Sequence, residues 1–311
     1  MWSGLSRRGK KLDDTLEDMR DPYRARGAGD PANAAMEQAV VRVIETMREN
    51  LGERITVDDM ARAAMFSKFH FSRIFQRITG VSPGRFLSAM RLQEAKRLLL
   101  TTSLTITEIT YLVGYSSVGT FSTRFKEAVG LPPTDYRRLG GFTDTISRDC
   151  RRRGLGVATT TVSGQVRPPD TGAVGPVFVG LFPDWIPQGS PVSCTVLRRP
   201  GPYQLDKVPP GTWHVLAHAM PPGLERYQHP GDEPLIVGAN GPITIRSGAG
   251  QRRADLCLRP MRVLDPPVLL ALFEVRMEAL GGAPQQDRAR ASADRAAARR
   301  AETGQVEQAR A

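Results

Sequence analysis

The 311-residue sequence predicts two domains of different class, an all-α tandem helix-turn-helix domain followed by an antiparallel β-sandwich domain. The first observation behind this prediction is a helical segment that occurs twice between residues 36 and 138. The second is a change of texture at residues 157–275, where alternating apolar residues and dense Pro and Gly replace helical spacing. The other segments are predicted to be a flexible arm (1–35), a basic linker (139–156) and a polar tail rich in Ala and Arg (276–311).

Composition limits the class of protein. The chain has 43 Lys and Arg against 32 Asp and Glu, a net charge of +11, which favours an anionic partner. No stretch approaches the ~18 apolar residues that span a bilayer, and the first residues contain no apolar core of a secretory signal. The three cysteines, Cys150, Cys194 and Cys257, match no zinc or disulfide spacing. We therefore expect a cytoplasmic protein that has no membrane partner and needs no metal or other cofactor.

The repeat supplies the helical elements in order. The segment ITVDDMARAAMFSKFHFSRIFQRITGVSPGRF at 55–86 recurs as LTITEITYLVGYSSVGTFSTRFKEAVGLPPTDY at 104–136. Each copy predicts a short helix, a turn, a second helix that ends at glycine (Gly80 or Gly130), and a helix that begins at proline. Two helices joined by a tight turn, twice over, are a tandem helix-turn-helix.

A longer helix connects the two copies. Its buried face is predicted from apolar residues at helical spacing between residue 83 and about residue 101, namely Ala89, Leu92, Ala95 and Leu99. At 1.5 Å per residue this helix spans about 27 Å. That length holds the two units close to one DNA turn apart, about 34 Å, so one chain is expected to enter two successive major grooves.

These residues also carry a family resemblance. The stretches FHFSRIFQRITGVSPGRFLSAMRLQEAKRLLL (69–100) and EITYLVGYSSVGTFSTRFKEAVGLPPTDYRR (108–138) resemble the AraC/XylS-type transcriptional regulators. The resemblance covers about a third of the chain, residues 36–138. It implies a DNA-binding domain of two helix-turn-helix units bridged by a long helix, and base contacts at the positions of Phe69, Ser72 and Arg73.

Periodicity alone predicts which side chains of the first unit face outward. If Phe71, Ile74, Phe75 and Ile78 are core, the opposite face presents the base-reading candidates Phe69, Ser72, Arg73 and Gln76. Arginine can form two hydrogen bonds with guanine, serine can bond either kind of base edge, and phenylalanine can contact a thymine methyl. Lys68 and Arg77 flank this face and suit phosphates. The alternative is that Phe69 packs on a neighbouring helix.

The second copy departs from the pattern. Its outward positions begin at Gly119, and its base-reading candidates are Ser122 and Thr123. Where the family usually places Arg after the Phe-Ser pair, this chain has Thr123, and the arginine follows at Arg124. One residue rotates a side chain by about 100°, so Arg124 is expected to face the flank of the helix rather than the floor of the groove. Phosphate contacts are expected instead from Thr120, Arg124 and Lys126.

The C-terminal region presents no catalytic set. Its predicted strands are 157–166, 176–182, 191–198, 202–206 and 212–219, with about three more up to residue 275. The strand at 176–182 is expected to be buried on both faces, because apolar residues occupy both of its alternating positions. VSGQV (162–166) and GPYQLDKVPPGTWHVLAHA (201–219) resemble transthyretin-like and carboxypeptidase-regulatory-like β-sandwich domains, a likeness that implies no single function.

His214 and His218 are about 13 Å apart along one strand, too far to share a metal, and we expect them to be solvated or hydrogen-bonded. Cys194 and Cys257 are expected to be small core residues, and Cys150 beside three arginines to be incidental rather than a redox sensor.

The sequence thus predicts a sequence-specific transcriptional regulator, not an enzyme, whose partner is double-stranded promoter DNA. The alternative is a non-specific or architectural DNA-binding protein. RNA polymerase is expected as a partner if the protein is an activator. An effector-binding or homodimer-forming role is expected for the β half, although no effector-binding residues can be assigned.

Overall fold

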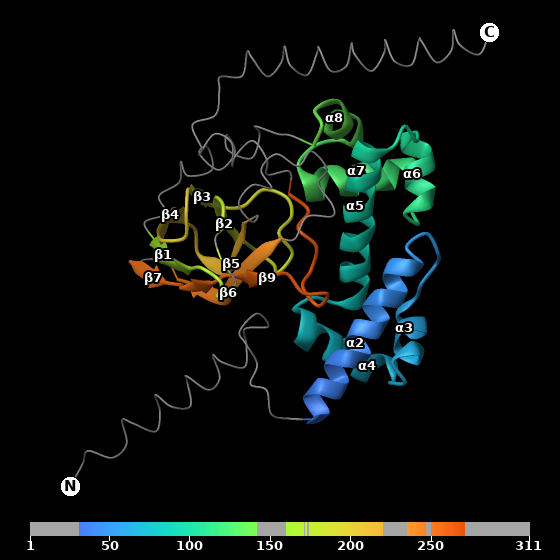
Figure 1. Cartoon of the computed structure of the whole chain (residues 1–311), viewed down its shortest axis with the longest axis horizontal. Coiled ribbons are helices and arrows are strands. Elements are labelled where there is room, and N and C mark those ends of the chain that lie inside the picture. Colours follow the sequence, from blue (N-terminus) through green and yellow to red (C-terminus); the bar gives the residue numbers. More distant parts are fainter. Residues whose placement is uncertain are drawn as a thin grey trace.

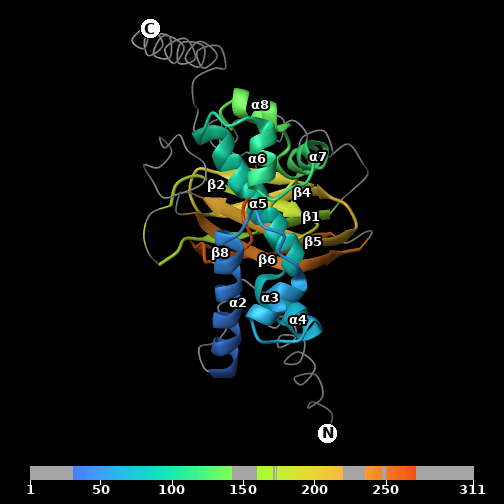
Figure 2. The same cartoon turned by 90° about the vertical axis from the view of Figure 1, so that its right-hand side faces the viewer.

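The computed structural model describes residues 31–141, 160–170, 172, 174–219, 235–246 and 250–270. Most of the expected arm, the linker from residue 142 onward with Cys150, and the tail lie outside the described residues. The helical half precedes the β half along the chain, and the two lie against each other in both views of the molecule (Figures 1 and 2).

The helical half follows the predicted repeat. Its helices are α2 (Pro31–Glu49), α3 (Val57–Ala63), α4 (Lys68–Thr79), α5 (Pro83–Thr101), α6 (Ile106–Leu112), α7 (Val118–Val129) and α8 (Pro133–Arg138). The predicted face of α5 is buried at Ala89, Leu92, Ala95 and Leu99. Helix α2 begins at Pro31, which places five more residues in the helical half than the expected boundary at residue 36.

Matching caps begin the first helix of each unit. Thr56 and Asp59 form a capping box at α3, and Thr105 and Glu108 form the same box at α6. Hydrogen bonds from Thr56 lower the pKa of Asp59, and those from Thr105 lower the pKa of Glu108, because they stabilise the ionised carboxylates. The boxes satisfy backbone N–H groups that an uncapped helix end would leave without partners.

The second helix of each unit begins at a serine cap and ends at the predicted glycine. Ser67 accepts a hydrogen bond from the backbone N–H of His70 at the start of α4, and Ser117 accepts one from Thr120 at the start of α7. Gly80 (φ 82°) and Gly130 (φ 96°) end these helices in the left-handed region, where a Cβ is unfavourable. The local sequence therefore fixes both the length and the register of α4 and α7.

The β half consists of two sheets. Its strands are β1 (Thr160–Arg167), β2 (Val177–Phe182), β3 (Cys194–Leu197), β4 (Pro202–Val208), β5 (Gly211–Ala219), β6 (Ile236–Ile245), β7 (Gln251–Arg253), β8 (Leu256–Cys257) and β9 (Arg259–Pro260). The five-stranded sheet has the order β3-β2-β5-β6-β9 and is antiparallel throughout. In the other sheet β1 pairs antiparallel with β4 but parallel with β7 and β8, a departure from the expected antiparallel arrangement.

Strand β2 contributes to two hydrophobic clusters. Val177, Val179 and Leu181 point into a cluster between the two sheets. Phe178 and Phe182 alternate with them and belong to the cluster that fills the helical half. All six residues of β2 are buried, as the sequence predicts. The five-stranded sheet therefore has one face against the other sheet and one face against the helices.

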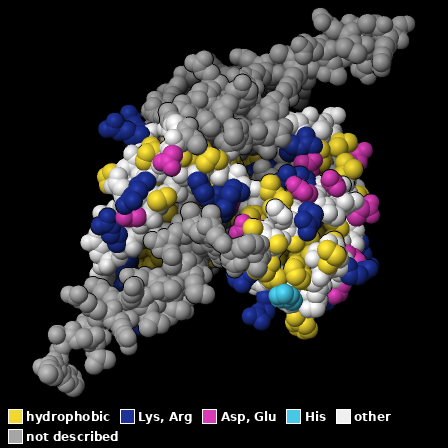
Figure 3. Space-filling model, turned by 60° about the horizontal axis from the view of Figure 1, so that its bottom comes forward, with side chains coloured by type: hydrophobic (Ala, Val, Ile, Leu, Met, Phe, Trp, Pro, Cys, Tyr) yellow, Lys and Arg dark blue, Asp and Glu magenta, His cyan; other side chains and the backbone are white. Residues whose placement is uncertain are grey.

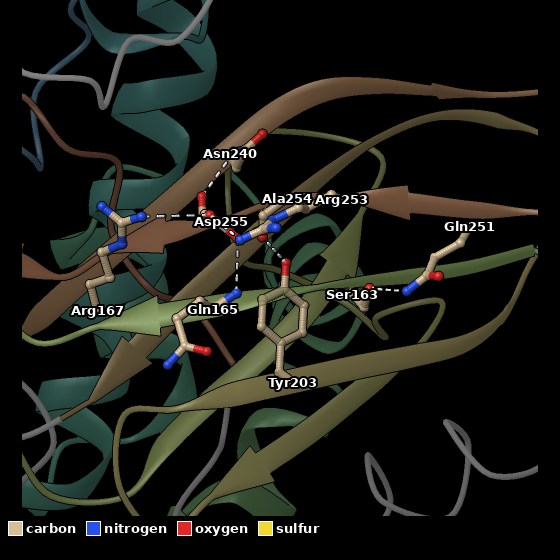
Figure 4. A network of polar contacts seen from close by, with 9 residues as sticks. All are labelled: Ser163, Gln165, Arg167, Tyr203, Asn240, Gln251, Arg253, Ala254 and Asp255. Carbon is tan, nitrogen blue, oxygen red and sulfur yellow. Dashed lines mark hydrogen bonds and ion pairs between the residues drawn. The ribbon is translucent and has the colours of Figure 1, made fainter.

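A polar network joins the late strands to β1 (Figure 4). Asp255 accepts hydrogen bonds from the backbone N–H of Gln165 (3.0 Å) and from the guanidinium of Arg253 (3.1 Å). These contacts lower the pKa of the Asp255 carboxyl because they stabilise its charge. The hydroxyl of Tyr203 donates to the carbonyl of Ala254, and Asn240 donates to the carbonyl of Asp255 at 2.9 Å. These contacts add to the ladder bonds that pair the short strands β7 and β8 with β1.

Candidate nucleic-acid interface

Helix α4 exposes the side chains that the sequence places on its outer face. Phe69 is 86% exposed, which excludes its packing on a neighbouring helix. Arg73 and Gln76 are exposed and Ser72 is half-buried, whereas Phe71, two residues from Phe69, is fully buried. The exposed Phe69 ring is therefore free to make an apolar contact with a partner.

The flanks of α4 are held by neighbouring groups. The Nζ of Lys68 lies 2.8 Å from the carboxylate of Asp58, and Arg77 Nη2 lies 3.4 Å from the sulfur of Met36. Arg73 and Gln76, in contrast, form no side-chain hydrogen bond or ion pair with any other described residue. The side chains of Arg73 and Gln76 can therefore donate hydrogen bonds to a ligand without first breaking a bond within the protein.

Helix α7 has a more polar exposed face than α4. Thr120, Thr123, Arg124 and Lys126 are exposed, and Ser122 is half-buried. The hydroxyl of Thr120 accepts a hydrogen bond from Ser117 at 3.1 Å, so it is already part of the helix cap. Gly119 stands where α4 has Phe69, and the exposed apolar tip is therefore missing from the second unit.

Two arginines that the sequence analysis did not single out fix the position of these helices. Arg91 on α5 donates to the carbonyls of Leu51 (2.9 Å) and Glu53 (2.6 Å). Arg137 on α8 donates to the carbonyls of Leu99 (3.0 Å) and Leu104 (2.6 Å). Burial lowers the pKa of Arg91. No local signal separates such arginines from surface ones, because their acceptors are backbone groups about 40 residues away.

Figure 3 shows one face of the molecule, on which apolar, basic and acidic side chains are interspersed. Large hydrophobic residues that are more than half exposed are Met65, Phe69, Tyr111 and Leu112, all within the two helix-turn-helix units. Arg62 and Lys68 are paired with Asp59 and Asp58, so part of the positive charge of the first unit is already neutralised.

Other expected positions need correction. His214 and His218 are 8% and 1% exposed, so they are buried rather than solvated. The ring of His214 lies 4.2 Å from that of Trp185, its Nδ1 has no hydrogen-bond partner among the described residues, and burial lowers its pKa to about 4. Cys194 is half-buried, and Cys257 is exposed rather than in the core, whereas its neighbours Leu256 and Leu258 belong to the cluster between the sheets.

The described part of the chain contains no group of three or more His, Cys, Asp or Glu arranged to hold a metal ion. No helix in that part is both long and apolar enough to cross a membrane.

The helical half consists of two units of two helices, joined by the 19-residue α5. The second helix of each unit is capped and has one exposed face. This arrangement defines a DNA-binding protein of the tandem helix-turn-helix class. Residues 60–139 match the family model described as a helix-turn-helix domain. The HTH-type transcriptional activator AarP of Providencia stuartii is 31% identical over 108 residues, which are 34% of this chain and 80% of AarP. The HTH-type transcriptional regulator GbdR of Pseudomonas aeruginosa is 34% identical over 96 residues, 31% of this chain and 26% of GbdR.

A solved AraC-type regulator from Chromobacterium violaceum has 27% sequence identity and a TM-score of 0.32, with 33% of this chain and 93% of that chain covered. The chain belongs to the AraC family of helix-turn-helix regulators, and it is a sequence-specific DNA-binding transcription regulator. It spans about a third of the length of several longer curated relatives.

Proposed function

We propose that α4 carries the base-specific contacts of this regulator. The observation that carries the proposal is the exposure of Phe69 (86%) on the same helix face as Arg73 and Gln76. The guanidinium of Arg73 can form two hydrogen bonds with guanine, and the amide of Gln76 can form two with adenine. Phe69 adds an apolar contact to a thymine methyl, and Ser72 adds a hydrogen bond to a base edge. Lys68 and Arg77 bind phosphates at the flanks of the same helix.

Helix α7 is proposed to hold the duplex rather than to select its sequence. Arg124 and Lys126 are exposed and have no ion-pair partner among the described residues, so they are available for phosphates. Thr120 adds a hydroxyl at the start of the helix. The base-reading candidates of α7 are Ser122 and Thr123, and both are short side chains with single hydrogen-bonding groups.

The connecting helix sets the distance between the two units. Its 19 residues rise about 28 Å, which suits two successive major grooves on one face of promoter DNA. Randomised-site selection tests this proposal, with one strongly and one weakly specified half-site expected about a helical turn apart. A specificity ratio near one at controlled salt would instead favour a non-specific or architectural DNA-binding protein.

We propose a separate role for each region of the chain. Residues 36–138 form the DNA-binding domain, and residues 157–275 form a β-sandwich of the transthyretin-like kind, with the arm, the basic linker and the tail as connecting or terminal segments. The β half binds an effector or forms homodimer contacts. If the protein is an activator, RNA polymerase is a further partner, and the protein acts in the cytoplasm. Support for the β-sandwich comes from the cluster that both sheets share.

A further inference from the structure

Two segments of the β half lie between its five-stranded sheet and the helices. The β2–β3 loop is residues 183–193, and the strap is residues 261–270, which follows β9. The strap passes beside α5 (orange in Figure 1). The backbone N–H of Leu269 donates to the carbonyl of Pro187 at 3.0 Å, so the two segments also bind each other.

Apolar burial joins these segments to the helical half. Trp185 and Ile186 of the β2–β3 loop belong to the same hydrophobic cluster as the core of the helices. The strap adds four buried residues to that cluster, namely Leu264, Val268, Leu269 and Leu270. A contact of this kind resembles a domain core rather than a transient interface, because buried apolar residues of both halves form one cluster.

Polar contacts fix the register of the interface on α5. Lys96 is 4% exposed, and its Nζ donates to the carbonyls of Val268 (3.1 Å) and Leu270 (3.4 Å). Near the start of the same helix, Arg85 forms an ion pair with Asp184 of the β2–β3 loop. The two contacts lie eleven residues apart on α5, about 16 Å along its axis, so they prevent the β half from rotating on the helix.

A third contact reaches the second helix-turn-helix unit. The backbone N–H of Gly189 in the β2–β3 loop donates to the carbonyl of Ala128 at 2.7 Å, at the C-terminal end of α7. Carbonyls at this end of a helix lack partners within the helix, so the loop satisfies one of them. The opposite end of α7 presents Thr120, Thr123 and Arg124.

We infer that the β half is a brace that fixes α7 relative to α5 and thereby sets the half-site spacing that the regulator accepts. Helix α7 has 12 residues and is about 18 Å long, so a tilt of about 10° about its held end moves its other end by about 3 Å. This displacement is close to the ~3.4 Å rise of one base pair. The inference rests on the proposed function, because it requires α4 and α7 to contact two half-sites.

The test uses the full chain and duplexes in which the two half-sites found by selection are moved apart or together by one base pair. The unaltered protein is expected to lose about tenfold in affinity for either change, comparable to one mismatched base pair. Lys96→Met removes the ammonium group but keeps the apolar stem, and Asp184→Ala removes the partner of Arg85. Both variants are expected to lose only about two- to threefold on the shifted duplexes, since a loosened α7 adapts its position.

Controls separate this effect from general damage. Arg253→Ala removes a surface arginine that pairs with Asp255 within the β half, away from the interface, and should keep the full spacing preference. A duplex with only the α4 half-site should bind every variant within about twofold, which also reports a folded first unit. Asp184→Asn replaces Asp184→Ala if the latter does not fold.

A spacing penalty that stays near tenfold in both interface variants would overturn the inference while leaving base reading by α4 intact. Loss of all site selectivity in the unaltered protein would instead overturn the proposed function.

Discussion

Met65 and Gly114 occupy the same position in the turns of the two units, and both have left-handed backbone conformations, with φ of 57° and 79°. The N–H of Met65 donates to the carbonyl of Arg62 and that of Phe66 to Ala61, while Gly114 and Tyr115 donate to Tyr111 and Thr110, all at 3.0 Å. The two turns thus share one hydrogen-bonding pattern. The first unit achieves it with a residue whose Cβ disfavours this conformation.

Met65→Gly is expected to raise the free energy of unfolding by about 0.5–1 kcal/mol, since relief of the left-handed strain exceeds the added chain entropy of glycine. The Met65 side chain is 86% exposed, so little packing is lost. Urea denaturation measures the change. Gly114→Ala is the opposite control and should destabilise, because a Cβ there meets the carbonyl of Leu51 and the guanidinium of Arg91. A less stable Met65→Gly protein would contradict this account.

Phe69→Ala is expected to change stability by less than about 0.5 kcal/mol, because the ring is exposed. The same variant should weaken specific DNA binding by about 1–2 kcal/mol through loss of an apolar contact. Phe71→Ala, two residues along and fully buried, should instead cost about 3–5 kcal/mol of stability. Thermal melts and fluorescence anisotropy give the two quantities. Equal DNA affinity of Phe69→Ala and the unaltered protein would exclude this ring from the interface.

Arg73→Ala should cost about 1–3 kcal/mol on the selected site and relax selectivity at one or two positions, because guanine edges differ along the duplex. Lys126→Ala or Arg124→Ala should weaken binding to all sequences alike and lower the salt slope by about one unit each, since phosphates repeat identically. Salt titrations on specific and random duplexes distinguish the two effects. Erasure of a particular guanine preference by Arg124→Ala would assign base reading to α7.

Acid is expected to destabilise the fold through His214. Its pKa is about 4 in the folded chain against 6.5 in a free side chain, because burial disfavours the imidazolium. Between these values the unfolded chain binds more protons, so the free energy of unfolding falls as the pH drops from about 6.5 to 4, by at most about 3 kcal/mol. Urea denaturation across this range checks the expectation. His214→Leu should remove this part of the pH dependence, and an unchanged profile would show that other groups cause it.

The helical half alone should retain DNA binding. A fragment of residues 31–141 contains both units with their caps, and its affinity should fall steeply with salt through counterion release. Gel-shift assays at two salt concentrations measure this. A fragment of residues 150–311 that binds the same promoter as tightly as the full chain would reverse the assignment.

Local sequence determined the helical half because each signal acts within a few residues. Thr56 with Asp59 and Ser67 with His70 begin helices, Gly80 and Gly130 end them, and apolar spacing assigns their faces. The exposed set on α4 followed from that spacing. The two-sided burial of β2 was also predicted from its continuous apolar run, although not what covers its second face.

Only the tertiary structure decided what lies against that second face. Phe178 and Phe182 meet the helical core, Lys96 binds carbonyls about 170 residues away, and His214 is buried beneath Trp185. The local sequence around a lysine on a helix or a histidine on a strand is the same whether the side chain is exposed to solvent or buried by another element. Apolar periodicity reports that a side chain is buried, whereas the identity of its partner depends on long-range packing that no local spacing encodes.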